Sequence, residues 1–148
     1  MFRQALIKAL SVTFISLMTL TAAASAADTT KVADEWQLLI KAISVVESGE
    51  NPKAVNGRHA GLLQISPICV RDCNKIAGKN KYTYKDRFDR DKSIEMFNII
   101  QSRYNPTKDF EKAIRLWNGG PGGIKYPQRT NKYYRRVMRV YEKLRGKK

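Results

Sequence analysis

The helical pattern around residue 40 ends in a carboxylate where a buried apolar side chain is expected. Trp36, Ile40, Ile43 and Glu47 fall at positions i, i+4, i+7 and i+11, so on a helix they share one face. Apolar surroundings and the negative end of the helix dipole both disfavour an ionised carboxyl. We therefore expect the pKa of Glu47 to be raised, and a protonated carboxyl in a cleft can act as a general acid. The alternative is a glutamate that turns into solvent at the helix end.

The elements that position this carboxylate are predicted to be helices separated by turns. A helix capped by Asp34 is expected to end at Gly49, and the dipeptides Asn51-Pro52 and Asn56-Gly57 are turn signals. Four more helices are expected, which start at Pro67 and after the caps Asp91, Thr107 and Thr130, and the stretch NGGPGG should stop the third of them. No alternating strand longer than four residues occurs. The sequence therefore predicts a mainly α fold, a single compact helical domain with at most a small β element.

Three stretches of the chain resemble the motifs of one protein family and occur in the same order. "ESGENPKAVNGRHAGLLQISP" is similar to the pattern E-S-x-x-N-P-x-A…G-L-M-Q-I-x-P of the soluble lytic transglycosylases. "AIRLWNGGPGG" stands where that family has A-x-x-x-Y-N-x-G, and "YYRRVMRVY" matches its closing Y-x-x-x-V helix. The resemblance spans Glu35 to Leu144. It places the chain in the lysozyme-like superfamily, related to goose-type lysozyme, and implies an α+β lysozyme-like fold with a glycan-binding cleft.

The resemblance also implies roles for individual residues. Glu47 is the family's catalytic acid, and no cofactor or metal ion is implied. Gln64 can offer its amide hydrogens and its carbonyl oxygen to a sugar. Ser48 is expected to be structural, Asn118 to steady its loop or the acid, and Trp117 either to stack on sugar or to pack in the core. The complete set expected to bind or shape the substrate is Ser48, Asn56, Gly61, Leu62, Leu63, Gln64, Trp117, Asn118 and Tyr133.

The chain departs from the family pattern at three positions. Leu63 replaces a methionine, and Asn56 stands where many members have a serine. Trp117 replaces a tyrosine, so a phenolic hydroxyl near the acid is either lost or supplied from elsewhere. The candidates for that hydroxyl are Tyr126, Tyr133 and Tyr134.

The reaction implied is cleavage of the β-1,4 bond between N-acetylmuramic acid and N-acetylglucosamine, with 1,6-anhydromuramyl ends as products. Hydrolysis of the same bond is the nearer alternative. Ordinary glycoside hydrolases use two carboxylates, and four aspartates outside any recognisable motif are available: Asp72, Asp86, Asp89 and Asp91. A non-catalytic exported protein that binds the cell wall or another polyanion is the alternative from a different class.

The N-terminal stretch has the features of a secretory signal peptide. Arg3 and Lys8 precede an apolar core of about 12 residues, and Ala24-Ser25-Ala26 is a cleavage site. The apolar core is short of the roughly 20 residues that a bilayer requires. We therefore expect residues 1–26 to be removed and residues 27–148 to form the transglycosylase domain, periplasmic or secreted and not inserted in a membrane.

The chain carries a large excess of positive charge. Its 28 Lys and Arg residues against 13 Asp and Glu residues give a formal net charge of +15, which favours a polyanionic partner. Peptidoglycan strands are the expected partner, because a positive cleft would concentrate their peptide carboxylates. Nucleic acid is not expected, since the aromatic residues of the basic C-terminal stretch fall at helical spacing and should pack inwards. A monomer is expected, with recruitment to a secretion or wall-remodelling complex left open.

Two cysteines, Cys69 and Cys73, lie at i and i+4. On a helix this spacing brings both thiols to one face, so either a disulfide or simple burial as small hydrophobic residues is open. With His59 as the lone histidine, the ligands are too few for a metal site.

Overall fold

The computed structural model describes residues 29–147, and the expected signal peptide of residues 1–26 lies outside them. The chain divides into two compact units, Met1–Trp36 and Gln37–Lys148. Residues 29–48 are helical, so the described part of the first unit is helix throughout. This helix continues into the second unit, which contains every other element and all of the site residues discussed below.

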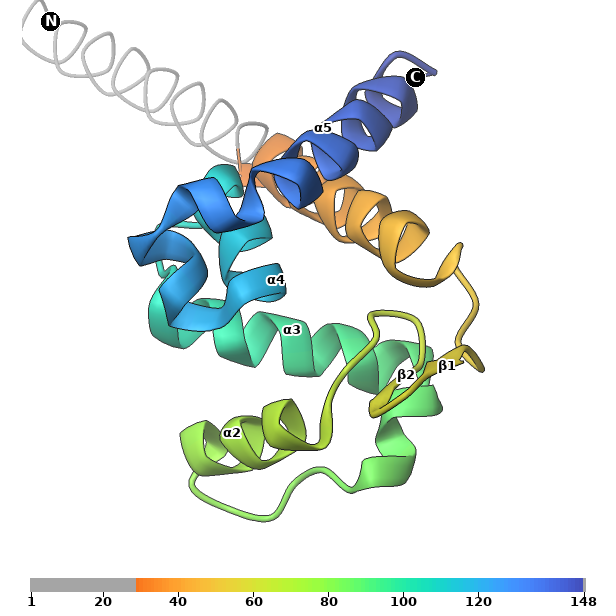
Figure 1. Cartoon of the computed structure of the whole chain (residues 1–148), viewed down its shortest axis with the longest axis vertical. Coiled ribbons are helices and arrows are strands. Elements are labelled where there is room, and N and C mark those ends of the chain that lie inside the picture. Colours follow the sequence, from red (N-terminus) through yellow and green to blue (C-terminus); the bar gives the residue numbers. More distant parts are fainter. Residues whose placement is uncertain (1–28, 148) are drawn as a thin grey trace, which may run out of the picture. The chain divides into compact units, whose positions relative to one another are not determined.

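The second unit is built mainly from helices, as expected. After residue 48 the elements are β1 (Val55–Asn56), β2 (His59–Ala60), α2 (Pro67–Ala77), η1 (Tyr84–Phe88), α3 (Arg90–Tyr104), α4 (Phe110–Lys125), η2 (Pro127–Thr130) and α5 (Asn131–Arg145) (Figure 1). The two strands pair antiparallel, Val55 with Ala60 and Asn56 with His59, around the Asn56-Gly57 turn. The prediction of a mainly α domain with a small β element is confirmed.

The helices pack in chain order around one apolar core. Helix α2 packs on α3, α3 on α4, and α4 on η2 and α5 (Figure 1). The residues that fill this core are almost fully buried: Leu39, Ile40, Ile43, Leu62, Leu63, Ile65, Val70, Met96, Phe97, Ile114 and Val137. Among the described residues, no helix combines the length and the apolar character that crossing a bilayer would require.

Two helices start at caps other than the predicted ones. Asp89, not Asp91, caps α3, since its carboxylate accepts a hydrogen bond of 2.9 Å from the Lys92 N–H. Asp109, not Thr107, caps α4. The reason is local: the Asn105 side chain accepts from the Asp109 N–H at 3.0 Å and donates to its carbonyl at 2.8 Å, which holds residues 105–109 in a turn. Side-chain hydrogen bonds of this kind compete with helix formation.

Two other predicted helix ends are wrong. Asp34 lies inside the first helix, because residues 29–33 are already helical. The NGGPGG stretch does not stop α4, which continues to Lys125 across a kink at Gly120. Gly120 has φ 60° and ψ −160°, a backbone conformation that glycine tolerates, and Pro121 is suited to restart the helix directly afterwards.

Candidate active site

Glu47 lies in the last turn of the first helix, where the chain turns sharply. Gly49 and Glu50 both have φ 64°, and their N–H groups donate to the helix carbonyls of Val45 and Ser44 at 3.1 and 3.2 Å. The turn is tied to the next segment by Ser48, whose hydroxyl donates to the Leu62 carbonyl at 2.8 Å. Ser48 is therefore structural, as expected, and it fixes the helix end that carries the carboxylate.

The carboxyl of Glu47 is held by a tyrosine from the other end of the sequence. The Tyr133 hydroxyl donates to Glu47 Oε1 at 2.6 Å. Burial raises the pKa of Glu47, and this outweighs the lowering by the Tyr133 hydrogen bond and by electrostatic interactions with His59 and Arg136. Burial and the charge of Glu47 together raise the pKa of Tyr133 well above its ordinary value, so the phenol stays a donor. The prediction of a raised pKa for Glu47 is confirmed, and Tyr133 supplies the phenolic hydroxyl near this carboxyl.

Glu47 opens onto a pocket of about 360 Å³. Five elements, the first helix, β2, α2, α3 and α4, and the segment between β2 and α2 form its wall. Of the expected site residues it includes Glu47, Gln64, Trp117 and Asn118. The remaining wall residues are His59, Ile65, Ser66, Ile68, Cys69, Asp72, Ile100, Tyr104, Leu116, Gly120 and Pro121. The kink at Gly120 thus contributes to the shape of the pocket.

Gln64 presents mainly an acceptor to this pocket. It has a positive φ of 50°, which is unusual for a residue with a side chain. Its amide nitrogen donates to the carbonyls of Gly61 at 2.9 Å and Ala54 at 3.3 Å. The amide hydrogens are therefore engaged within the loop, and the side-chain oxygen is the group left for a ligand.

Trp117 packs against the core and also lines the pocket. Its ring packs against Phe97 with the ring centres 4.9 Å apart, and its indole N–H donates to the Leu63 carbonyl at 3.2 Å. The residue is nevertheless half-exposed and lines the pocket. Its neighbour Asn118 is exposed in the same wall, so its amide is open to a ligand.

Several expected substrate residues lie outside the pocket wall. Leu62 and Leu63 are buried in the core, 1% and 0% exposed, so their side chains support the site from behind. Gly61 has φ 81° and lies so close to the Arg87 carbonyl that a Cβ would clash with it. Asn56 is exposed in β1 and is not part of the wall.

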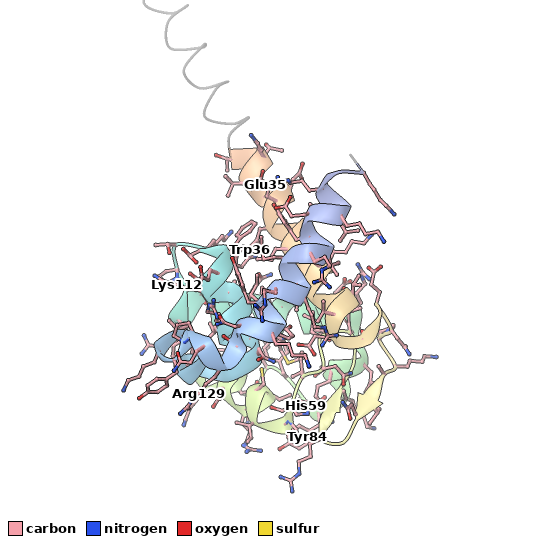
Figure 2. The ribbon with its side chains drawn as sticks, turned by 45° about the horizontal axis from the view of Figure 1, so that its top comes forward. Glu35, Trp36, His59, Tyr84, Lys112 and Arg129 are labelled. Carbon is pink, nitrogen blue, oxygen red and sulfur yellow. The ribbon has the colours of Figure 1, made fainter. Side chains whose placement is uncertain are left out.

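Sequence reasoning missed part of the wall. One missed wall residue is His59, which lies in β2. In Figure 2 it is at the same end of the domain as Tyr84 of η1, whereas Arg129 of η2 lies elsewhere. Ile68 and Asp72 are one helical turn apart on α2, a spacing that could have identified them once α2 was known to border the cleft. Asp72 brings a second carboxylate into the pocket.

The pocket is not the positive cleft that the net charge led us to expect. Within the described residues, its wall includes neither lysine nor arginine, and its ionisable side chains include Glu47, Asp72 and His59. The excess positive charge must lie on other surfaces, because the cations are distributed over exposed helix faces.

The two cysteines are free thiols in the structure. Cys73 is buried and its thiol donates to the Met96 carbonyl at 3.5 Å, while Cys69 lies at the pocket wall. Contact with Cys73 and burial raise the pKa of Cys69 far above its ordinary value, which makes it a poor nucleophile. This arrangement fits the expectation of burial as small hydrophobic residues.

Comparison with known proteins gives one family. No curated protein and no solved structure matches the chain. The family model of the transglycosylase SLT domain matches residues 24–137, a range that includes Glu47, every residue of the pocket wall and Tyr133. The chain therefore belongs to the SLT transglycosylase family.

Proposed function

We propose that this protein is a lytic transglycosylase that cleaves the β-1,4 bond between N-acetylmuramic acid and N-acetylglucosamine, with Glu47 as its only catalytic carboxylate. Membership of the SLT family indicates a peptidoglycan-acting function of this general type. The observation that carries the finer assignment is a half-buried carboxyl with a raised pKa at the pocket wall, held by Tyr133 at 2.6 Å.

In the first step Glu47 acts as an acid. Its raised pKa extends the protonated, acid form of the carboxyl to higher pH than in an ordinary glutamate. Because the Tyr133 hydroxyl donates to Oε1, Oε2 is the oxygen that carries the proton. The proton passes to the glycosidic oxygen, which takes the electron pair of the breaking bond and leaves the muramyl C1 as an oxocarbenium-like centre.

In the second step the same group acts as a base. The Glu47 carboxylate takes a proton from the muramyl C6 hydroxyl, and that oxygen bonds to C1 to close a 1,6-anhydro ring. The hydrogen bond from Tyr133 and the charge of Arg136 stabilise the carboxylate between the two steps, since both lower its pKa. No water is consumed, and a second carboxylate is not required.

Three wall residues are suited to hold the sugars. The side-chain oxygen of Gln64 and the amide of Asn118 can bond to N-acetyl and hydroxyl groups. The half-exposed ring of Trp117 offers an apolar surface to a sugar face. Ser48, Gly61, Leu62 and Leu63 keep this wall in place.

Hydrolysis of the same bond is a second candidate, favoured by one observation. Asp72 lines the same pocket as Glu47, and a hydrolase would use a second carboxylate to activate water or to bond to C1. The products distinguish the two routes, because hydrolysis leaves reducing muramyl ends.

SLT domains act on peptidoglycan, which lies outside the cytoplasm. We accordingly keep the assignment of residues 1–26 as a signal peptide and of residues 27–148 as the exported domain. N-terminal sequencing of the protein recovered from the periplasm or medium should begin at Ala27. A start at Met1 in the exported fraction would rule the assignment out.

The function is tested by digestion of purified peptidoglycan, with the products identified by mass spectrometry. We expect anhydromuramyl ends from the wild type and no products from Glu47→Gln. Glu50→Gln is the matched control, because Glu50 follows in the same turn but is absent from the pocket wall. Reducing ends that disappear in Asp72→Asn would establish hydrolysis instead. Cleavage by Glu47→Gln at the wild-type rate would remove Glu47 from the mechanism.

A further inference from the structure

Five exposed cations form a stripe along α5. At 3.6 residues per turn they lie within about 100° of arc on the helix surface. The opposite side of α5 is buried through Tyr133, Val137 and Tyr141, so the helix is anchored in the core. The residues of this α5 stripe are Lys132, Arg135, Arg136, Arg139 and Lys143.

The cations of the α5 stripe are unpaired, whereas several others are not. Arg115 bonds to Glu111 at 2.8 Å, and Lys81 bonds to Glu95 at 2.9 Å. Within residues 29–147, none of the five stripe residues takes part in an ion pair. Like charges three and four residues apart on a helix repel one another. A bound anion would relieve this repulsion.

The α5 stripe passes close to the candidate acid at Arg136. Arg136 is close enough to lower the pKa of both Glu47 and Tyr133. Tyr133, which bonds to Glu47, precedes Arg136 by one turn of the same helix. Because the described pocket wall includes neither lysine nor arginine, the positive charge that an anionic substrate meets lies next to the pocket.

We propose that the α5 stripe binds the carboxylate-bearing peptides carried by the muramic acid residues of the glycan, so that the preferred substrate is peptide-substituted strands. This inference rests on the proposed function. From Arg136 to Lys143 the stripe covers about 10 Å of helix axis, and an extended peptide of about three residues has the same length. A peptide attached to a sugar bound at Glu47 would start near Arg136, whose charge acts on that carboxyl. Arginine side chains are suited to bind such a peptide, since they bind carboxylates through two parallel hydrogen bonds.

The test compares cleavage of peptide-bearing glycan strands with cleavage of strands whose peptides an amidase has removed, at low ionic strength and with the full chain. We expect the wild type to have the higher kcat/KM on peptide-bearing strands. The double variant Arg139→Gln/Lys143→Gln changes two residues that have no electrostatic effect on Glu47, and it should lower the ratio of the two kcat/KM values about fivefold. Lys75→Gln/Lys79→Gln removes the same charge from exposed positions at the end of α2 and just after it, and should keep the wild-type ratio.

A second measurement does not depend on a variant. The wild-type ratio should fall towards one as salt screens the exposed cations. Equal cleavage of both substrates by the wild type at low salt would overturn the inference while the proposed function stands. Failure to cleave either substrate would instead count against the proposed function. The proposal would also be overturned if Arg139→Gln/Lys143→Gln kept the wild-type ratio of the two kcat/KM values but bound polyphosphate more weakly. That result would assign the stripe to a phosphate polymer.

Discussion

Two glutamates of this protein accept a hydrogen bond from a tyrosine, and their pKa values move in opposite directions. Tyr133 donates to Glu47 at 2.6 Å, and Tyr82 donates to Glu95 at 3.1 Å. The pKa of Glu47 is raised, with burial as the largest cause. The pKa of Glu95 is lowered, first by its hydrogen bond with Lys81 and then by the bond from Tyr82.

The comparison shows that burial of Glu47 and the ion pair of Glu95 with Lys81, not the tyrosine, decide the direction. In both places the tyrosine bond lowers the pKa of the carboxyl. The side chain of Glu95 is 42% exposed and lies 2.9 Å from the Lys81 ammonium, so its charged form is solvated and paired. Glu47 is half-buried and forms no ion pair with another described residue. A glutamate bonded to a tyrosine is therefore part of a surface ion pair in one place and a candidate acid in the other.

The largest expected difference between the two glutamates is in the rate of cleavage. Glu47→Gln should lower kcat about 10³-fold or more, because general acid catalysis contributes roughly 10²–10⁴-fold. Glu95→Gln, the matched variant, should stay within about twofold of the wild type, since surface substitutions away from a site have small effects. Release of soluble fragments from peptidoglycan measures both. Equal losses in the two variants would mean that the comparison has no bearing on catalysis.

The second largest difference is expected between the phenylalanine variants of Tyr133 and Tyr82. Tyr133→Phe should lower kcat about tenfold to a hundredfold, because a hydrogen bond to a charged group contributes about 1.5–3 kcal/mol. It should also raise the pKa of Glu47, since the lost bond lowers that pKa. The acid form persists below the pKa, so the fall of kcat/KM at alkaline pH should move to higher pH. Tyr82→Phe should leave the pH profile of cleavage unchanged, and a displaced profile there would contradict the assignment.

The stability of the two glutamine variants should change in opposite directions with pH. The unfolded chain loses the Glu47 proton near 4.5, before the folded chain does, so wild-type stability falls as the pH rises above 4.5. Glu47→Gln removes this loss and should have the higher Tm at pH 7 but not at pH 4. The gain is about 1.4 kcal/mol for each pH unit between the folded and unfolded pKa values.

Glu95→Gln should show the reverse, a slightly lower Tm at pH 7. The lowered pKa of Glu95 means that its contribution is present above the unfolded value of 4.5 and is lost as the pH falls through the folded pKa. Its exposure keeps the effect small. Thermal melts at pH 4 and pH 7 measure both variants, and a lower Tm for Glu47→Gln at pH 7 would contradict the raised pKa.

The smallest effects should come from the neighbouring charges. His59→Gln should raise the pKa of Glu47, by less than Tyr133→Phe does, because the charge of His59 is a smaller cause than the hydrogen bond. Lys92→Gln should likewise raise the pKa of Glu95. Carboxyl titrations followed by NMR spectroscopy can resolve these changes. A larger rise in the His59 variant than in the Tyr133 variant would reverse the order of causes that the structure indicates.

Much of the fold followed from local patterns. Apolar residues at helical spacing and turn-forming dipeptides predicted the mainly α domain, the turn after Gly49 and the helix from Pro67 to Gly78, whose start and left-handed end agree with the structure. The helix starts near Asp91 and Thr107 were predicted wrongly, because several residues there can cap a helix. Which one does so depends on hydrogen bonds such as those of Asn105 with Asp109, and spacing alone does not reveal them.

The candidate site was also predicted in part. Glu47, Gln64, Trp117 and Asn118 belong to motifs and do lie in one pocket wall. Asp72 and Tyr104 belong to no motif, and they reach the wall only because α2 and the end of α3 border the same pocket. Leu62 and Leu63 were expected at the substrate, yet their side chains point into the core.

The sequence by itself determined the family, the helical class and the choice of Glu47 as the candidate acid, because these depend on residue type and on spacing along a helix. Tertiary structure alone decided the partner and environment of that acid. Tyr133 lies 86 residues away in the chain, and its bond to Glu47 forms because the fold brings α5 to the end of the first helix. Tertiary packing also separated the positive charge from the pocket, since burial and solvation depend on what surrounds a residue in space and not on its neighbours in sequence.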